Sequence, residues 1–243
     1  MAVLEVLIYA VISYFVATVI HEFGHVLAGL MNKWKLMMMV VGPFKLYRED
    51  LNGKIKFGLE KNPVLWGGCG GTAPTVIDDS VGRVFARILI AGPVASLILG
   101  LAAIAAFILS RYDFLLMLGM IAIGEGIACI LPMNIKTGIL YNDGTRFKRI
   151  IGRGKEAEEE KAIISMVLCE LANNKDEVKR REEHLIDVLL ESDDASYRYY
   201  GLYYAYRKAK EEGDEAKMGE IRAEAERHRG EVSKYVVSSC EML

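Results

Sequence analysis

Three ionisable side chains lie within five consecutive residues of a long apolar segment. The five residues read His21-Glu22-Phe23-Gly24-His25, an HExxH pattern. On a helix, residues four positions apart share a face, so the two imidazoles can bind a single Zn²⁺. Glu22 lies one residue further along and flanks the metal without having to ligate it. The spacing therefore predicts a zinc site with a carboxylate beside the metal.

Two histidines leave a catalytic zinc one protein ligand short. The sequence offers several candidates for the third: Asp143, Glu125, Asp78 or Asp79, Glu60, His184 and His228. Asp143 is favoured because it precedes Gly144 just beyond an interrupted helical pattern, in which Pro132 and Gly138 are the interruptions. Irregular backbone at membrane depth is tolerated where it lines a cavity. Glu125 is the second candidate, although a carboxylate in a span can also simply face the bundle interior.

Three long apolar segments hold or flank these residues, at 6–31, 88–110 and 114–135. At 1.5 Å per residue, each is long enough as a helix to cross a hydrocarbon core of about 30 Å. Their charged or imidazole side chains are the HExxH residues and Glu125. Because an ionisable group inside a span costs roughly 2.5 to 3.5 kcal/mol, the cluster requires a compensating partner. We predict three transmembrane helices in a multi-pass integral membrane protein.

Basic residues are concentrated in the first loop and after the third span. The loop at 32–87 contains nine Lys or Arg, and the turn between the second and third spans offers only Arg111. Three more basic residues follow the third span: Arg146, Lys148 and Arg149. The positive-inside tendency then places the loop and the C-terminal domain in the cytoplasm and the N-terminus outside. We expect the membrane to be the plasma membrane of a prokaryote. We expect the first span to be retained, because Glu5 precedes it and the first basic residue is Lys33.

The first loop contains short segments with β-propensity. Residues 36–41 and 44–47 are apolar or β-prone, residues 54–57 alternate, and Asn52-Gly53 between them is a hairpin signal. We predict a small β-hairpin here. The Gly-rich segment at 65–71 is expected to form a turn, which either brings backbone close to a ligand or serves as a connector.

The average composition hides two different halves. The 243 residues are 52% hydrophobic with a net charge of −2, yet residues 1–150 carry +4 and residues 151–243 carry −6. This apolar content excludes a disordered chain, and the few glycines and prolines exclude a collagen-like one. The four cysteines are widely spaced and predict neither a disulfide framework nor a thiolate metal site.

The acidic half is predicted to be helical. Four amphipathic segments are separated by short loops, which indicates an array of antiparallel helical hairpins: 155–173, 176–191, 195–212 and 214–237. Its acidic excess argues against nucleic-acid binding. The predicted domains are a membrane-embedded unit at 1–150 and a cytoplasmic α-helical unit at 151–243, in a mainly α fold.

Three motifs occur in a recognisable order along residues 1–150. They are HEFGH in the first span, Ala91-Gly92-Pro93 early in the second, and Leu131-Pro132 with Asp143-Gly144 after the third. In these the sequence resembles the site-2 protease family, the intramembrane zinc metalloproteases. The resemblance implies a metalloprotease core of three transmembrane helices. It also implies one Zn²⁺ per chain, held by His21, His25 and Asp143, with Glu22 as the catalytic base.

The resemblance also bears on substrate binding. It implies that the loop containing the hairpin and Gly67-Gly68 guides substrate to the metal. Many members have asparagine where this chain has Ser96 and Cys129, and Asn134 is a candidate to replace a lost contact. Glu125 is a candidate either for the metal or for a contact with substrate. The other substrate-binding candidates are Gly67, Gly68, Ser96 and Asn134.

The predicted function is that of a zinc endopeptidase which hydrolyses a peptide bond in or near a substrate's membrane-embedded segment. Glu22 would act as general base on a zinc-bound water. The expected partners are a membrane protein or peptide substrate, and a regulatory protein or a second copy of the chain bound through residues 151–243.

Two alternatives remain open from the sequence. The first is a catalytically silent membrane scaffold or receptor with a structural metal, which recruits partners through its C-terminal domain. The intact Glu22 argues against it, since a structural site needs no base. The second is a zinc hydrolase that acts on a lipid or another amide, for which no head-group motif is present.

Overall fold

The computed structural model describes residues 3–78, 80–133, 136–137, 140–172 and 175–240. Over these residues the chain is mainly helical, with a small antiparallel sheet early in the chain, so the predicted fold class is confirmed. The elements in chain order are α1 (Val3–Met31), β1 (Lys35–Val41), β2 (Phe44–Tyr47), β3 (Lys56–Leu59), η1 (Pro63–Gly67), β4 (Cys69–Ala73), α2 (Val81–Ser110), α3 (Asp113–Ile130), β5 (Lys136–Thr137), β6 (Leu140–Tyr141), α4 (Asp143–Ile151), α5 (Lys155–Ala172), α6 (Lys175–Leu190), α7 (Ala195–Glu212), α8 (Glu215–His228), η2 (Arg229–Glu231) and α9 (Lys234–Ser239).

The three predicted spans are α1, α2 and α3, each long and apolar enough to cross a membrane. The third ends at Ile130 rather than continuing to residue 135. Leu131 leaves the helix with φ −70° and ψ 126°, because a residue that precedes a proline is driven away from helical dihedrals. The helices α2 and α3 pack closely where Gly100 faces Gly119, since a Cβ on Gly100 would lie 3.0 Å from the Gly119 carbonyl oxygen.

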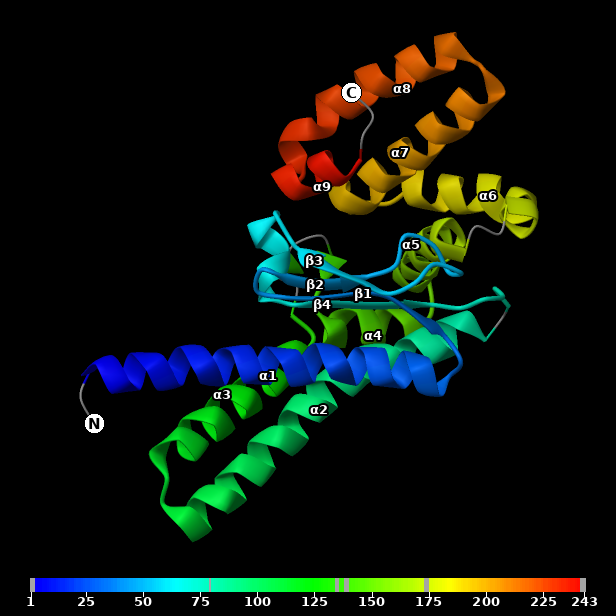
Figure 1. Ribbon diagram of the computed structural model, residues 1–243. Coiled ribbons are helices and arrows are strands. Elements are labelled where there is room, and N and C mark those ends of the chain that lie inside the picture. Colours follow the sequence, from blue (N-terminus) through cyan, green and yellow to red (C-terminus); the bar gives the residue numbers. More distant parts are fainter. Residues whose placement is uncertain (1–2, 79, 134–135, 138–139, 173–174, 241–243) are drawn as a thin grey trace.

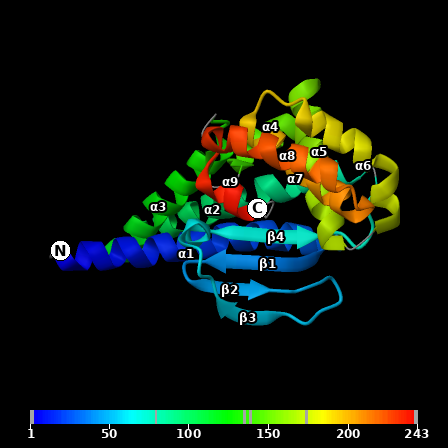
Figure 2. The ribbon, with the colours of Figure 1, turned by 90° about the horizontal axis from the view of Figure 1, so that it is seen from above.

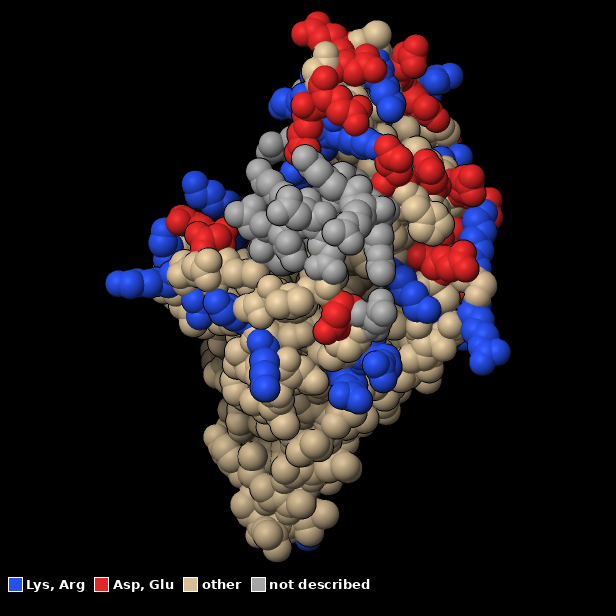
Figure 3. All heavy atoms as spheres, turned by 90° about the vertical axis from the view of Figure 1, so that its right-hand side faces the viewer, with Lys and Arg blue, Asp and Glu red and all other residues tan. Residues whose placement is uncertain are grey.

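The membrane helices and the C-terminal helices lie at opposite ends of the molecule. Figure 1 shows α2 and α3 as a hairpin at one end, α6 to α9 at the other, and α1 crossing α2 and α3. On the face drawn in Figure 3, charged side chains gather over the upper part, and the tapering lower end is almost free of them. This division of charge is what a chain with one end in lipid and the other in water requires.

The predicted hairpin is part of a four-stranded antiparallel sheet with the order β3-β2-β1-β4. The β1 and β2 strands pair with Val41 opposite Phe44, and β2 pairs with β3 with Phe44 opposite Leu59. The Asn52-Gly53 signal lies in the loop between β2 and β3. Seen from above in Figure 2, β4 and β1 run along α1 while β2 and β3 extend away from it.

The prediction of a turn throughout the Gly-rich segment 65–71 is wrong, because its second half is the strand β4. A Cβ on Gly70 would lie 2.9 Å from the backbone oxygen of Glu22, and one on Gly29 would lie 2.1 Å from Oγ1 of Thr72. Glycine within a strand marks a close approach of another backbone. Here the glycines allow β4 to lie directly against α1.

Two features of the C-terminal half differ from the prediction. The helix α4 was not expected; it begins after Asn142, whose side chain accepts a hydrogen bond from the Thr145 amide at 3.2 Å. The fourth predicted helix, 214–237, is wrong as a single element. It divides into α8, η2 and α9, and Ser233 starts α9 by accepting a hydrogen bond from the Val236 amide. The domain division at 150/151 stays a prediction.

Candidate metal centre

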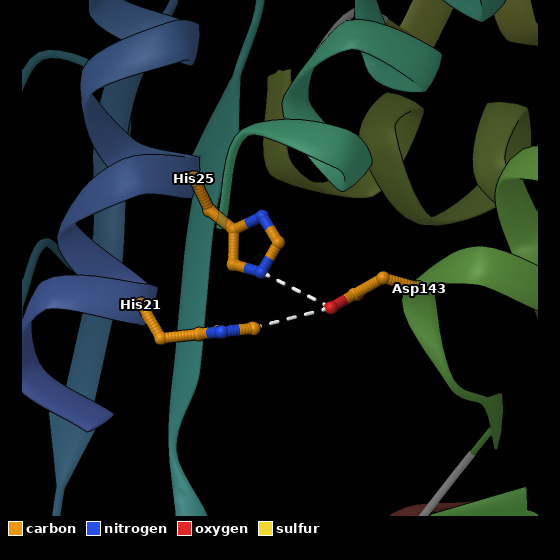
Figure 4. Close-up of side chains that lie close together, drawn as sticks. All are labelled: His21, His25 and Asp143. Atoms are coloured by element: carbon orange, nitrogen blue, oxygen red, sulfur yellow. Dashed lines mark hydrogen bonds and ion pairs between the residues drawn. The ribbon is translucent and has the colours of Figure 1, made fainter. Parts of the chain in front are cut away.

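The helix α1 presents both histidines of the motif on one face. His21 and His25 are buried, and their ring centroids lie 4.9 Å apart. Figure 4 shows the two rings pointing away from α1 toward Asp143 at the start of α4. Oδ2 of Asp143 lies 3.3 Å from Nε2 of His21 and 3.4 Å from Nε2 of His25. The structure thus brings together the three residues proposed as zinc ligands.

Close packing between α4 and the end of α3 brings Asp143 to this position. A Cβ on Gly144 would lie 2.0 Å from the Ile130 carbonyl oxygen, so only glycine allows this approach. The Asn142 side-chain amide donates to the carbonyl of Ala128 at 3.0 Å and to that of Leu131 at 2.7 Å. These carbonyls at the C-terminus of α3 lack helical partners, and Asn142 satisfies them.

Hydrogen bonds on the far side of each imidazole set its tautomer. Nδ1 of His25 lies 2.7 Å from the Ile88 carbonyl oxygen, which can only accept, so the proton is on Nδ1. The hydroxyl of Ser96 has one hydrogen and donates it to Oε2 of Glu125 at 3.3 Å. Its oxygen therefore accepts from Nδ1 of His21 at 3.0 Å. In the neutral rings, both Nε2 atoms are left as acceptors.

Three acceptor atoms therefore converge on one point. The two Nε2 atoms and a carboxylate oxygen of Asp143 lie within 4.8 Å of one another. Three lone pairs directed at one another repel unless a cation lies between them. Two imidazoles and a carboxylate are also the ligand set of catalytic zinc sites that keep a fourth position open. The residues present fit a zinc ion.

Glu125 lies next to this group but outside it. Oε1 of Glu125 accepts a hydrogen bond from Thr18 at 3.1 Å, and Oε2 accepts from Ser96. Glu125 thus reaches His21 through the Ser96 hydroxyl instead of pointing at the cluster. In metal sites, such outer partners fix ring orientation and raise the basicity of the ligand.

The other described candidates for the third ligand lie away from this group. Glu60 is paired with Lys45 at 3.0 Å, and Asp78 accepts a hydrogen bond from the backbone amide two residues later. His184 is exposed on α6, and His228 ends α8. None of these side chains belongs to the cluster of His21, His25 and Asp143. Asp79, like Gly138, lies outside the described residues.

Glu22 is buried against the glycines that precede and form β4. A Cβ on Gly68 would lie 2.4 Å from Oε1 of Glu22, and one on Gly70 would lie 2.9 Å from Oε2. Gly68 has φ +116°, a conformation that favours glycine. Burial, with a smaller contribution from the charge of Glu22, raises the pKa of Cys69 to about 12. This thiol is therefore neutral near pH 7, and it is not among the three donors that converge at the centre.

The predicted substrate-binding residues fall into different places. Gly68 lies beside Glu22, whereas a Cβ on Gly67 would have Tyr14 as its neighbour, at 3.9 Å. Ser96 is fully buried and bonded to a histidine of the cluster. Asn134 lies outside the described residues. Cys129, like Cys69, is a free thiol.

A comparison with protein-family models places these residues in a wider context. The model of peptidase family M50 matches residues 9–223. The chain belongs to peptidase family M50. This is the site-2 protease family of membrane zinc metalloproteases, so the resemblance noted in the sequence is confirmed. The family match extends beyond residues 1–150 into the C-terminal helices. No curated protein and no solved structure gave a match.

Sequence reasoning missed several residues that shape the centre of this M50 peptidase. The Ile88 carbonyl carries no recognisable signal in the sequence, because a contact made by a backbone oxygen does not depend on side-chain type. Gly70 lies in the Gly-rich segment for which the sequence predicts a turn, and its position in a strand beside Glu22 is a tertiary contact. Thr18 had a weak signal. It is a polar residue in an apolar helix, three positions before His21 and hence on the same face.

Replacing Gly92 in the Ala-Gly-Pro motif should weaken both zinc binding and folding in this M50 peptidase. A Cβ there would lie 2.3 Å from Nε2 of His25, so Gly92→Ala must displace the ring. We expect zinc affinity to fall by at least about tenfold, by analogy with perturbed outer-shell contacts. We also expect a stability loss of about 1 to 3 kcal/mol from overpacking. Zinc titration and thermal unfolding in detergent measure both.

Gly124→Ala is the matched control for this prediction. Gly124 also lies inside a membrane-capable helix, but a Cβ there would meet nothing within 4 Å. Zinc affinity should then equal that of the wild type. Equal affinities in Gly92→Ala and Gly124→Ala would contradict the assigned position of the His25 ring.

Proposed function

We propose that this M50 peptidase is a zinc endopeptidase that hydrolyses a peptide bond in or near the membrane-embedded segment of a membrane protein or peptide. The observation that carries the proposal is the convergence of His21, His25 and Asp143 on one point. Glu22 is buried next to His21 on α1, the helix that carries both histidines. A structural metal site has no use for an additional buried carboxylate. This arrangement favours an enzyme over a silent scaffold.

In this proposal one zinc ion per chain is held by His21, His25 and Asp143. When bound, zinc lowers the pKa of a water to about 7 and polarises a carbonyl group. Glu22 accepts the proton of the attacking water and delivers it to the leaving amine. Its position against the backbone of Gly68 and Gly70 limits the access of other water to its carboxylate.

The sheet supplies a place for an extended substrate. A helical substrate hides its carbonyl groups in hydrogen bonds between residues i and i−4, so it must unwind before attack. The β4 strand has one neighbour, β1, in the described sheet, and it runs along α1 beside Glu22. Its free edge can bind an unwound segment by β-augmentation. The proposed guide for substrate is thus the segment from Gly68 to Gly70 rather than Gly67.

The proposed orientation follows the distribution of basic residues. The sheet and the C-terminal helices would face the cytoplasm, and the N-terminus of α1 would lie outside, in a prokaryotic plasma membrane. Residues 151–243 would then be available to a regulatory protein or a second copy of the chain.

The proposal is tested by identifying the substrate in cells. Membrane peptides from cells with wild-type protein and cells with Glu22→Gln are compared by mass spectrometry. We expect fragments cut in or near a transmembrane segment in the wild type alone, and stoichiometric zinc in both purified proteins. Identical peptide profiles, together with normal cellular function of Glu22→Gln, would favour the silent scaffold instead.

A further inference from the structure

The C-terminal helices contact the chain just before Asp143. The Tyr141 hydroxyl donates to Oδ2 of Asp194 at 2.5 Å. Asp194 is also the N-cap of α7, where its other oxygen accepts from the Ser196 amide at 2.8 Å. Tyr141, two residues before Asp143, is thus hydrogen-bonded to the N-terminus of α7.

Ion pairs bind the same segment on the side following Asp143. Arg146, one turn into α4, donates from Nε to Oε1 of Glu160 at 2.7 Å. Arg149, another turn along, donates from Nη2 to Oε2 of Glu159 at 2.7 Å. Both glutamates belong to α5 and are buried, and Glu160 has no exposed surface at all.

Aromatic contacts connect these two attachments. The Arg149 guanidinium lies 5.0 Å from the ring centroid of Tyr141 and 4.7 Å from that of Tyr197, and the two rings are stacked. The Tyr197 hydroxyl donates to Glu160. Two arginines and two glutamates balance one another in this cluster. Removing one partner would leave an uncompensated buried charge, so α4 is held firmly against α5 and α7.

The histidines and Asp143 reach the metal centre from separate elements. His21 and His25 are fixed within α1, whereas Asp143 depends on the placement of α4. Contacts from α3 hold one side of Asp143 through Gly144 and Asn142. The C-terminal helices hold the segment both before and after it.

We propose that α5 and α7 position Asp143 for zinc binding, with Glu160 and Asp194 as positioning residues. The inference rests on the proposed function in one respect, the role of Asp143 as a zinc ligand. It makes the C-terminal helices a structural part of the metal centre. A partner that shifts α5 or α7 would then change the affinity for zinc.

The test measures the zinc dissociation constant of the full-length protein in detergent by competition with a chelator. Glu160→Gln should weaken zinc binding by about tenfold, the lower end of the effect of outer-shell changes. Glu160→Asp keeps the charge and should recover most of the affinity. Tyr141→Phe removes only the hydroxyl that binds Asp194 and should weaken binding by up to about tenfold, the lower end of the same range, even where Glu160→Gln fails to fold.

Tyr206→Phe is the matched control for Tyr141→Phe. The Tyr206 hydroxyl, on α7, accepts from Nη2 of Arg222 on α8 at 2.6 Å, away from α4. Its loss should leave zinc affinity unchanged. Equal affinities for the wild type, Glu160→Gln and Tyr141→Phe would overturn the positioning role, as would equal weakening by Tyr206→Phe. Wild-type protein that binds no zinc would overturn both this inference and the proposed function.

Discussion

Glu22→Gln is expected to keep its zinc and to lose peptide cleavage by a factor of about 10² to 10⁴, the usual contribution of a general base. Glutamine has nearly the same shape as glutamate but cannot accept the proton of the attacking water. Glu22 is not among the three donors that converge at the centre, so its replacement should not release the metal. Single-turnover cleavage of a membrane-embedded peptide and the metal content of the purified protein measure the two effects.

Glu5→Gln is the control for this substitution. Glu5 lies on the same helix, α1, but in its exposed first turn. Its replacement should change neither the cleavage rate nor the zinc content. Loss of zinc from Glu22→Gln would make Glu22 a ligand, and an unchanged cleavage rate would remove its assignment as the base.

Local spacing was enough to place the two histidines together. The pair His21 and His25 needs only one helical turn, and the long apolar segment around them already predicts a helix. Asp143 is separated from His21 by 122 positions, and no local rule joins residues so distant. The sequence could only rank it among several acidic and histidine candidates. Its place depends on Gly144 and Asn142, whose contacts with the end of α3 are tertiary.

The β4 strand shows a different limit of prediction. Glycines have low intrinsic strand propensity, so Cys69-Gly70-Gly71 indicates a turn. The strand forms because β1 lies on one side and α1 packs against it, and glycine is what that packing requires at Gly70. The proline that shortened α3 was visible in the sequence. Its effect on Leu131 could have moved the predicted end of the third span.

Ser96 shows a contact that the sequence does not predict. Its place in a family motif predicts a role in substrate binding, which stays a prediction, and its hydroxyl lies between His21 and Glu125. The resulting relay, in which His21 donates to Ser96 and Ser96 donates to Glu125, keeps Nε2 of His21 free to bind a cation. From the sequence, Glu125 could be either a metal ligand or a polar residue that faces the bundle interior. In the structure it accepts the hydrogen bond that orients Ser96 toward His21.

Asp143→Asn and Glu125→Gln form the pair of substitutions that identifies the third ligand. Each replaces a carboxylate with an amide of the same shape in the same region of the protein. Asp143→Asn should weaken zinc binding by more than about 100-fold, because direct ligands contribute more than outer-shell partners, whose loss costs about 10- to 100-fold. Glu125→Gln should weaken it by less than about tenfold, since the amide oxygen can still accept from Ser96 while the amide NH2 faces the Thr18 hydroxyl, which can accept as well as donate.

Zinc dissociation constants and peptide cleavage, measured on both variants, decide between the two carboxylates. If Asp143 is the ligand, its variant loses zinc and cleavage together, and added zinc partly restores cleavage. Glu125→Gln should then retain zinc at the free zinc concentrations that load the wild-type protein. The reverse order of affinities would make Glu125 the third ligand. That result would require a rearrangement in which Glu125 leaves Ser96 and Thr18, and the His21 tautomer would then no longer be fixed by Ser96.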